Sequence, residues 1–205
     1  MSKSNYKIPS ETVIIRQEIK KSKFIATIGR ANNMDSAKTF IDNVSSGYSD
    51  ASHNCYAFIA GNPFSTTDIG FGDDGEVSGT AGMPMLNILQ HKKIGEIVAV
   101  ITRYFGGTRL GTGGLVRAYS SSLQLALNEL KLIELVPVKT GGIVFAYEYE
   151  NAIRNILTMM KVKIKDINYS ENVNINIETS ETVLKQLADE IANQTHGRAV
   201  LHFKE

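Results

Sequence analysis

The sequence predicts an α+β protein with two domains, and three observations carry this prediction. The first part of the 205-residue chain places glycine loops between apolar runs and helical patterns. The remainder carries short strands and helices in the order βαββαβ, which is the ferredoxin-like split motif. Pro137 lies between the two parts and indicates a boundary, so we expect domains at residues 1–136 and 137–205.

Two features of the first domain are strongly patterned. Two β-rich runs within residues 12–29 are separated by Lys20, Lys21 and Ser22, and they predict a hairpin with a basic surface. The run EIVAVIT at 96–102 is almost continuously apolar. We therefore expect a strand that is covered on both faces and that delivers the next three residues, RYF, to its end.

The other elements of the first domain follow from apolar residues at helical spacing or in short runs. They are a helix at 34–44, a strand at 54–60, helices at 84–91 and 115–130, and a closing strand at 132–136.

The second domain has its own regular pattern. Its elements are a strand at 142–148, a helix from 151, strands at 162–167 and 173–177, a helix at 183–191 and a strand at 199–203. Two helices on one face leave the other face of the sheet open, and alternation places Lys161, Lys163 and Lys165 there. This surface could dock RNA or a protein, although a solvated face is the simpler interpretation.

Composition narrows the classes of function. The net charge of +1 excludes a protein that binds nucleic acid through a strong overall positive field, so any basic surface must be local. The single cysteine, Cys55, excludes an intrachain disulfide and fits a reducing compartment. The polar start shows no secretory signal, and no apolar run is long enough to span a bilayer. We expect a cytoplasmic protein without a membrane segment.

Residues 70–119 hold 11 of the 17 glycines and alternate glycine loops with apolar runs, so we expect the functional surface in this segment. A buried strand there is followed by the loop GGTRLGTGG and by a helical pattern. Backbone amides and the helix dipole at such a junction favour an anion. Arg103, Arg109 and Arg117 add three guanidinium groups around the same turn.

This loop matches neither common nucleotide motif. Thr112 stands where a Walker A loop requires lysine, and Val116 stands where the dinucleotide fingerprint expects glycine. Two interpretations stay open. Gly113, Gly114 and Arg117 could cradle a phosphate or carboxylate, or the glycines could serve only a tight turn and close packing.

An acidic cluster, Asp73, Asp74 and Glu76, lies earlier in the same stretch. Three carboxylates could hold Mg²⁺ or transfer protons. They could also pair with the nearby arginines or cap the following helix, and we favour this structural role because no ligand spacing is present.

His53 and Cys55 share one face of a predicted strand, which makes a thiolate–imidazole pair conceivable. A buried thiol beside a hydrogen-bonded histidine is the better interpretation. We identify no catalytic triad, metal site or cofactor motif.

Two long motifs resemble the signature of the IMPACT family, including its bacterial YigZ and YvyE branch. They are DDGEVSGTAGMPML from Asp73 and VAVITRYFGGTRLGTGGLVRAYSSSLQLAL from Val98, within family-like sequence that extends from ASHNCYAF to about residue 130. Two departures are visible: Val77 stands where the family often has proline, and Asn54 where a second histidine is common.

The resemblance implies a first domain with the fold of the second domain of ribosomal protein S-five and a ferredoxin-like second domain similar to the end domain of elongation factor G. It implies a link to translation, because eukaryotic relatives act in translational control. It also implies a functional patch, which maps onto Asp73, Asp74, Glu76, Arg103, Tyr104, Arg109 and Arg117.

We therefore expect a non-enzymatic module that binds RNA, the ribosome or a translation-associated protein, without a cofactor. Its contact surface would be the turn from Arg103 to Arg117 and the basic hairpin, assisted by the lysine face of the second domain. The expected binding residues are Asp73, Asp74, Glu76, Arg103, Tyr104, Gly106, Gly107, Arg109, Gly113, Gly114 and Arg117.

Two alternatives remain. One is an enzyme for a small phosphorylated or nucleotide-like substrate, with Asp74 or Glu76 as metal ligand or base and the glycine turn as phosphate cradle. The other is a protein–protein adaptor that binds no nucleic acid. The sequence does not determine the oligomeric state.

Overall fold

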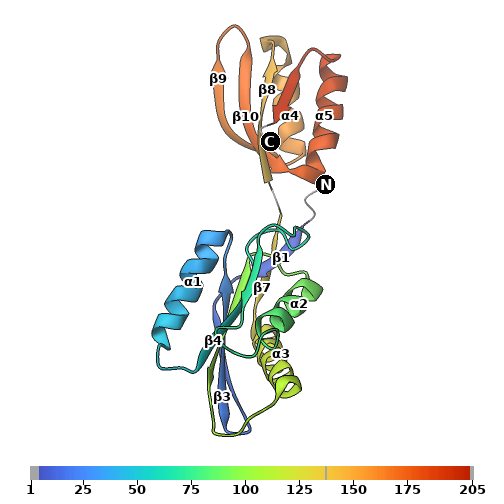
Figure 1. Cartoon of the computed structure of the whole chain (residues 1–205). Helices are drawn as coiled ribbons and strands as arrows, with labels where there is room; N and C mark the ends of the chain where they lie inside the picture. Colours follow the sequence, from blue (N-terminus) through green and yellow to red (C-terminus); the bar gives the residue numbers. More distant parts are fainter. Residues whose placement is uncertain (1–4, 137, 204–205) are drawn as a thin grey trace. The chain divides into compact units, whose positions relative to one another are not determined.

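The computed structural model describes residues 5–136 and 138–203, and their α+β arrangement in two compact units confirms the predicted fold class (Figure 1). The first unit is Tyr6–Leu135, and the second begins at Val136. Pro137, where the sequence places the boundary, lies outside the described residues. Among the described helices, none combines the length and hydropathy needed to cross a bilayer.

A five-stranded antiparallel sheet forms the centre of the first domain. Its order is β2-β3-β6-β4-β5, with bounds β2 Val13–Ile19, β3 Ser22–Arg30, β6 Ile97–Tyr104, β4 His53–Ile59 and β5 Ile69–Gly72. The predicted hairpin is β2–β3, and the apolar run is the central strand β6, buried along nearly its whole length.

The prediction was wrong about the end of this strand. β6 continues through Arg103 and Tyr104, which we expected to follow it. Because successive residues of a strand point to opposite faces, these two side chains are separated rather than presented together. Arg103 pairs in register with buried Phe24, and Tyr104 pairs with exposed Lys23.

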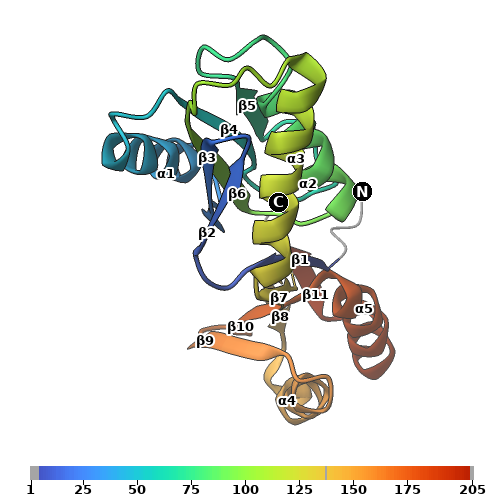
Figure 2. The same cartoon turned by 90° about the horizontal axis from the view of Figure 1, so that it is seen from below.

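Helices cover both faces of the sheet (Figures 1 and 2). Helices α2 (Gly82–Lys92) and α3 (Thr112–Glu129) pack on one face and enclose the main hydrophobic core. Helix α1 (Met34–Gly47) lies on the other face, where a smaller cluster joins Ala37 to Phe58 and Val98. On that face α1 contacts β6, β3 and β4.

Two strands were not predicted. β1 (Tyr6–Pro9) pairs with the closing strand β7 (Leu132–Leu135) in a separate two-stranded sheet. β5 carries Gly70 and Gly72, which normally weaken a strand. They are required here because the rings of Phe58 and Tyr56 lie over them, at 2.5 Å from the position that a Cβ would take.

The second domain has the predicted βαββαβ order. Its elements are β8 Val138–Phe145, α4 Glu150–Met159, β9 Lys163–Tyr169, β10 Val173–Ser180, α5 Glu181–Thr195 and β11 Val200–Phe203, with a short 3-10 turn at Tyr147–Tyr149. The strand order is β11-β8-β10-β9, and α4 and α5 cover one face (Figure 1).

The open face of this second sheet carries Lys163 and Lys165, as expected, whereas Lys161 lies in the turn before β9, with a φ of 53°. The ammonium groups of Lys163 and Lys165 contact the carboxylate of Glu178 on β10, at 3.2 and 3.0 Å. The charge of these lysines is therefore partly neutralised by a neighbouring strand, which weakens the face as an anion-binding surface.

Candidate functional site

The acidic loop between β5 and α2 begins with Asp73, whose carboxylate holds the start of the helix. Its oxygens accept hydrogen bonds from the backbone N–H groups of Gly79 at 2.7 Å, Gly82 at 2.8 Å and Ala81 at 3.1 Å. The first N–H groups of a helix have no partner within it, and the helix dipole also favours a negative charge there. The Asp73 side chain therefore stabilises the junction between loop and helix.

Asp74 fastens the same loop to β4. Its Oδ2 accepts a hydrogen bond from the backbone N–H of Asn54 at 2.6 Å. Its carbonyl oxygen lies 2.8 Å from Nδ1 of His53. Asp74 adopts a φ of 43°, so these two contacts hold a residue in the left-handed region.

Glu76 forms a buried ion pair with Arg103. Nη1 of the arginine lies 2.5 Å from Oε1 of the glutamate, and only 6% and 4% of the two side chains are exposed. The hydroxyl of Tyr119 donates to the same Oε1 at 3.0 Å, and Nε2 of His53 lies 3.7 Å from it. Burial and these partners leave neither charge available on the surface.

The Arg103 guanidinium also packs between two aromatic rings. Its central carbon lies 5.7 Å from the ring centroid of Phe24 and 5.6 Å from that of Phe105, as in cation–π contacts. Nη2 donates to Oγ of Ser22 at 3.4 Å, while Nε finds no acceptor among the residues that the structure describes. Arg103 thus links the end of β6 to the hairpin and to the acidic loop.

Cys55 belongs to the same buried network. Its thiol donates to the carbonyl oxygen of Asp73 at 2.9 Å, and the hydroxyl of Tyr119 is 3.4 Å away. Burial raises the pKa of the Cys55 thiol to about 12, and burial also raises the pKa of Tyr119. A protonated, enclosed thiol is a poor nucleophile at neutral pH. Within residues 5–136 and 138–203, no group of three or more His, Cys, Asp or Glu side chains is arranged to hold a metal ion.

The glycine turn after β6 rests on the tip of the β2–β3 hairpin. A Cβ at Gly106 would lie 2.0 Å from the carbonyl carbon and oxygen of Lys21, so only glycine allows this approach. The Gly106 N–H donates to Oγ of Ser22 at 3.2 Å. Gly107 adopts a φ of 82° in open space, and Arg109 is exposed two residues later.

Helix α3 starts beside this turn. Gly111, with a φ of 72°, precedes the helix, and no side chain caps it. The first turn holds exposed Gly113 and half-buried Gly114, with exposed Arg117 one turn further on. The arrangement leaves the positive end of this helix open to solvent.

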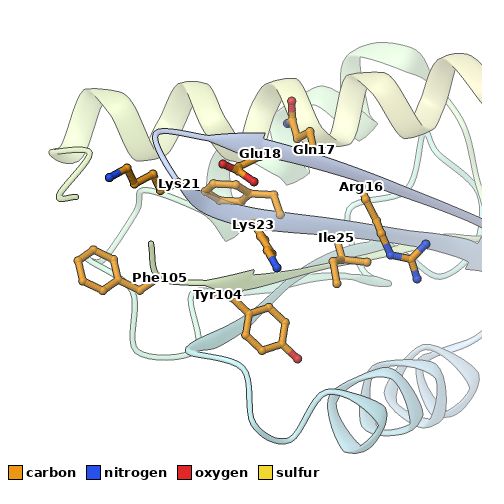
Figure 3. A pocket seen from close by; sticks show the side chains of 9 residues that line it. Arg16, Gln17, Glu18, Lys21, Lys23, Ile25, Tyr104 and Phe105 are labelled. Atoms are coloured by element: carbon orange, nitrogen blue, oxygen red, sulfur yellow. The ribbon is translucent and has the colours of Figure 1, made fainter. Parts of the chain in front are cut away.

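An open cavity of about 760 Å³ lies over the β2, β3 and β6 strands near the hairpin tip (Figure 3). Figure 3 shows Arg16, Lys23 and Tyr104 extending from the three strands on the side away from α3. The full lining is Arg16, Gln17, Glu18, Lys21, Lys23, Phe24, Ile25, Tyr104 and Phe105.

The cations of this cavity differ from those of the second domain. Arg16, Lys21 and Lys23 are exposed and form no ion pair with any residue that the structure describes, whereas Glu18 is the one acid in the lining. Phe105 is 51% exposed at one wall. The Tyr104 hydroxyl donates to Oδ1 of Asp50 at 2.7 Å. This hydrogen bond holds the ring in place and raises the pKa of Tyr104.

The structure divides the expected site residues into two sets. Glu76 and Arg103 form a buried ion pair, while half-buried Asp73 and exposed Asp74 fix the acidic loop beside it. The other set lies at the surface and comprises half-buried Tyr104 and exposed Gly107, Arg109, Gly113 and Arg117, with Gly106 and Gly114 packed beneath.

Sequence reasoning did not select Arg16, Lys23 and Phe105 as individual site residues. The available signal was alternation: Arg16 and Lys23 lie on the same face of paired strands, where Lys23 pairs in register with Glu18 and Arg16 is its diagonal neighbour.

Comparison with known proteins places the chain in a family. Residues 20–127, more than half of the chain, match the Impact N-terminal domain, and residues 143–198 match a domain of unknown function, DUF1949. The chain belongs to the IMPACT family.

Three bacterial members of the family resemble this chain over most of their length. An IMPACT family member of Haemophilus influenzae is 35% identical over 98% of both chains, and YigZ of Escherichia coli is 35% identical over 93% of both. YvyE of Bacillus subtilis is 34% identical over 88% of this chain and 82% of its own. The likeness extends to structure, because a crystal structure described as that of a hypothetical protein matches with a TM-score of 0.71 at 34% identity over 98% of both chains.

Proposed function

We propose that this IMPACT protein is a non-enzymatic, cytoplasmic module that binds single-stranded RNA and serves translation or its regulation. The observation that carries the proposal is the open cavity on the first sheet, which combines three unpaired cations with two aromatic rings. Its volume of about 760 Å³ lies within the range of cavities that hold small molecules or single nucleotides.

The side chains have the chemistry that single-stranded RNA requires. Guanidinium and ammonium groups bind phosphates, while exposed aromatic rings stack on bases that are free of a duplex. Arg16 and Lys23 supply charge from two adjacent strands, and Phe105 and Tyr104 supply ring surface at the end of a third. The contact of Tyr104 with Asp50 fixes its ring before any ligand arrives.

The enzymatic alternative receives less support. The carboxylate of Asp74 already accepts a backbone N–H, and Glu76 is buried against Arg103. A general base or metal ligand must be able to reach its substrate or ion. Use of Glu76 would break its buried ion pair with Arg103, and use of Asp74 Oδ2 would compete with the Asn54 N–H that fixes the loop to β4.

The test is binding of an RNA single strand of about 12 nucleotides to the full chain, measured by fluorescence anisotropy. Three phosphate contacts predict a slope of log Kd against log salt of at least about 2, so affinity should fall about 20-fold between about 50 and 200 mM salt. The variant Arg16→Gln/Lys23→Gln should lower that slope by about 1.4.

Matched controls distinguish binding at this surface from non-specific attraction of RNA to any cationic surface. Lys163→Gln/Lys165→Gln removes the same number of cations from the second domain, where Glu178 pairs with them, and it should leave RNA affinity nearly unchanged. A DNA single strand and an RNA duplex of the same sequence show whether the sugar and the free bases matter. Absence of RNA binding by the wild-type chain, or equal losses in both double variants, would refute the proposal.

A further inference from the structure

The tip of the β2–β3 hairpin separates two cavities. The tip is the two-residue turn Lys20–Lys21, with φ values of 48° and 68°, both in the left-handed region that a type I′ turn uses. Lys21 lines the cavity already described, whereas Lys20 lines a second cavity of about 240 Å³.

The second cavity lies between the hairpin and the start of α3. Its lining is Ile19, Lys20, Leu110, Gly114, Arg117, Ala118 and Ser121. Two of these residues are cations, one is a hydroxyl, and none is an acid. Lys20 and Arg117 are exposed, and neither forms an ion pair within the described part of the chain. The cavity therefore has a positive charge that the protein itself does not balance.

The backbone between the two cavities is held in place. Gly106 packs directly against the carbonyl group of Lys21, and the Ser22 hydroxyl is contacted by both Gly106 and Arg103. A lysine in the left-handed region is uncommon, and two in succession require such support from neighbouring structure. The turn thus presents its two consecutive lysines to two different cavities.

We propose that one strand of RNA crosses the hairpin tip and occupies both cavities at once. This inference rests on the proposed function and specifies its ligand as a chain of several nucleotides. A mononucleotide could neutralise the cations of only one cavity, whereas a phosphodiester backbone carries a charge at every step. Lys20 and Arg117 bind phosphate in the second cavity, while the larger cavity binds a base together with its phosphates.

The test compares two RNA lengths on the full-length variant Lys20→Gln/Arg117→Gln. An RNA of about 12 nucleotides should bind about tenfold or more weakly than to the wild type at about 50 mM salt, with a salt slope lower by about 1.4. An RNA of about three nucleotides, measured by NMR titration, should keep its wild-type affinity. The reference variant Arg16→Gln/Lys23→Gln should weaken both RNAs.

The outcomes separate this inference from the proposed function. If the long RNA binds the Lys20→Gln/Arg117→Gln variant as it binds the wild type, the second cavity is not part of the path and only this inference fails. If the short RNA loses affinity as much as the long one, the two cavities do not act in succession along a strand. If the wild type binds neither RNA, the proposed function fails and this inference fails with it.

Discussion

The ion pair between Glu76 and Arg103 gives a sharp prediction, because both partners are almost completely buried. Glu76→Gln keeps the shape of the side chain and removes its charge, which leaves the guanidinium without a counterion inside the fold. Removal of one partner from a buried pair typically costs 3–5 kcal/mol. We expect a loss of about 3 kcal/mol in the free energy of unfolding, at the lower end because the amide oxygen can still accept a hydrogen bond from Arg103.

The measurement is a urea titration followed through amide NMR signals of the first domain, so that unfolding of the second domain does not enter. Glu11→Gln is the control within the same domain, because Glu11 and its partner Lys131 are exposed and such pairs contribute no more than about 1 kcal/mol. A double-mutant cycle with Arg103→Met should give a favourable coupling energy between positions 76 and 103 of about 2 kcal/mol. A loss below about 1 kcal/mol for Glu76→Gln would refute the structural role that we assign to this pair.

Two further predictions concern the core and the turn. The buried Cys55 thiol, with a pKa of about 12, should react with a thiol reagent at about pH 8 only after unfolding, since about 10⁻⁴ of it is thiolate there. Because this pKa exceeds the unfolded value of about 8.5, its stabilising contribution is complete below about pH 8.5 and is lost as the pH rises towards 12. Cys55→Ala should therefore show a smaller decline in stability between about pH 9 and 11, and rapid labelling of the folded protein at about pH 8 would contradict the burial. Gly106→Ala should cost about 2 kcal/mol of stability in urea titrations, because its Cβ would overlap Lys21. Gly113→Ala is the matched control, since its nearest neighbour is the flexible end of Arg117 at 3.9 Å, and equal losses in the two variants would contradict the close approach.

Most regular elements could be predicted from the sequence because their signals are local. The apolar run of β6 and the βαββαβ rhythm of the second domain needed no information from distant residues. β5 was missed because its glycines are explained only by the rings of Tyr56 and Phe58 on the neighbouring strand. Such a reason is visible only after the strands are paired.

The site was harder to predict for a related reason. Arg103 and Tyr104 are neighbours in sequence, and the expectation grouped them in one patch. The arginine is buried because Glu76, 27 residues earlier, supplies its counterion, and no local pattern predicts such a pairing. Lys163 and Lys165 were likewise recognised as outward-facing, but their partner Glu178 lies on the adjacent strand.

The pairing of β1 with β7 has a consequence for how the chain folds during synthesis. Tyr6 pairs with Leu135 and Pro9 with Leu132. The first strand of the domain therefore cannot pair until almost the last residues of the domain have been synthesised. At roughly 5–20 residues per second, that delay is about 6–25 seconds. Ile8, which is only 1% exposed in the finished domain and pairs with Ile133, cannot be covered by β7 during this interval. The nascent first domain therefore offers chaperones and proteases an apolar strand until translation has almost reached the second domain.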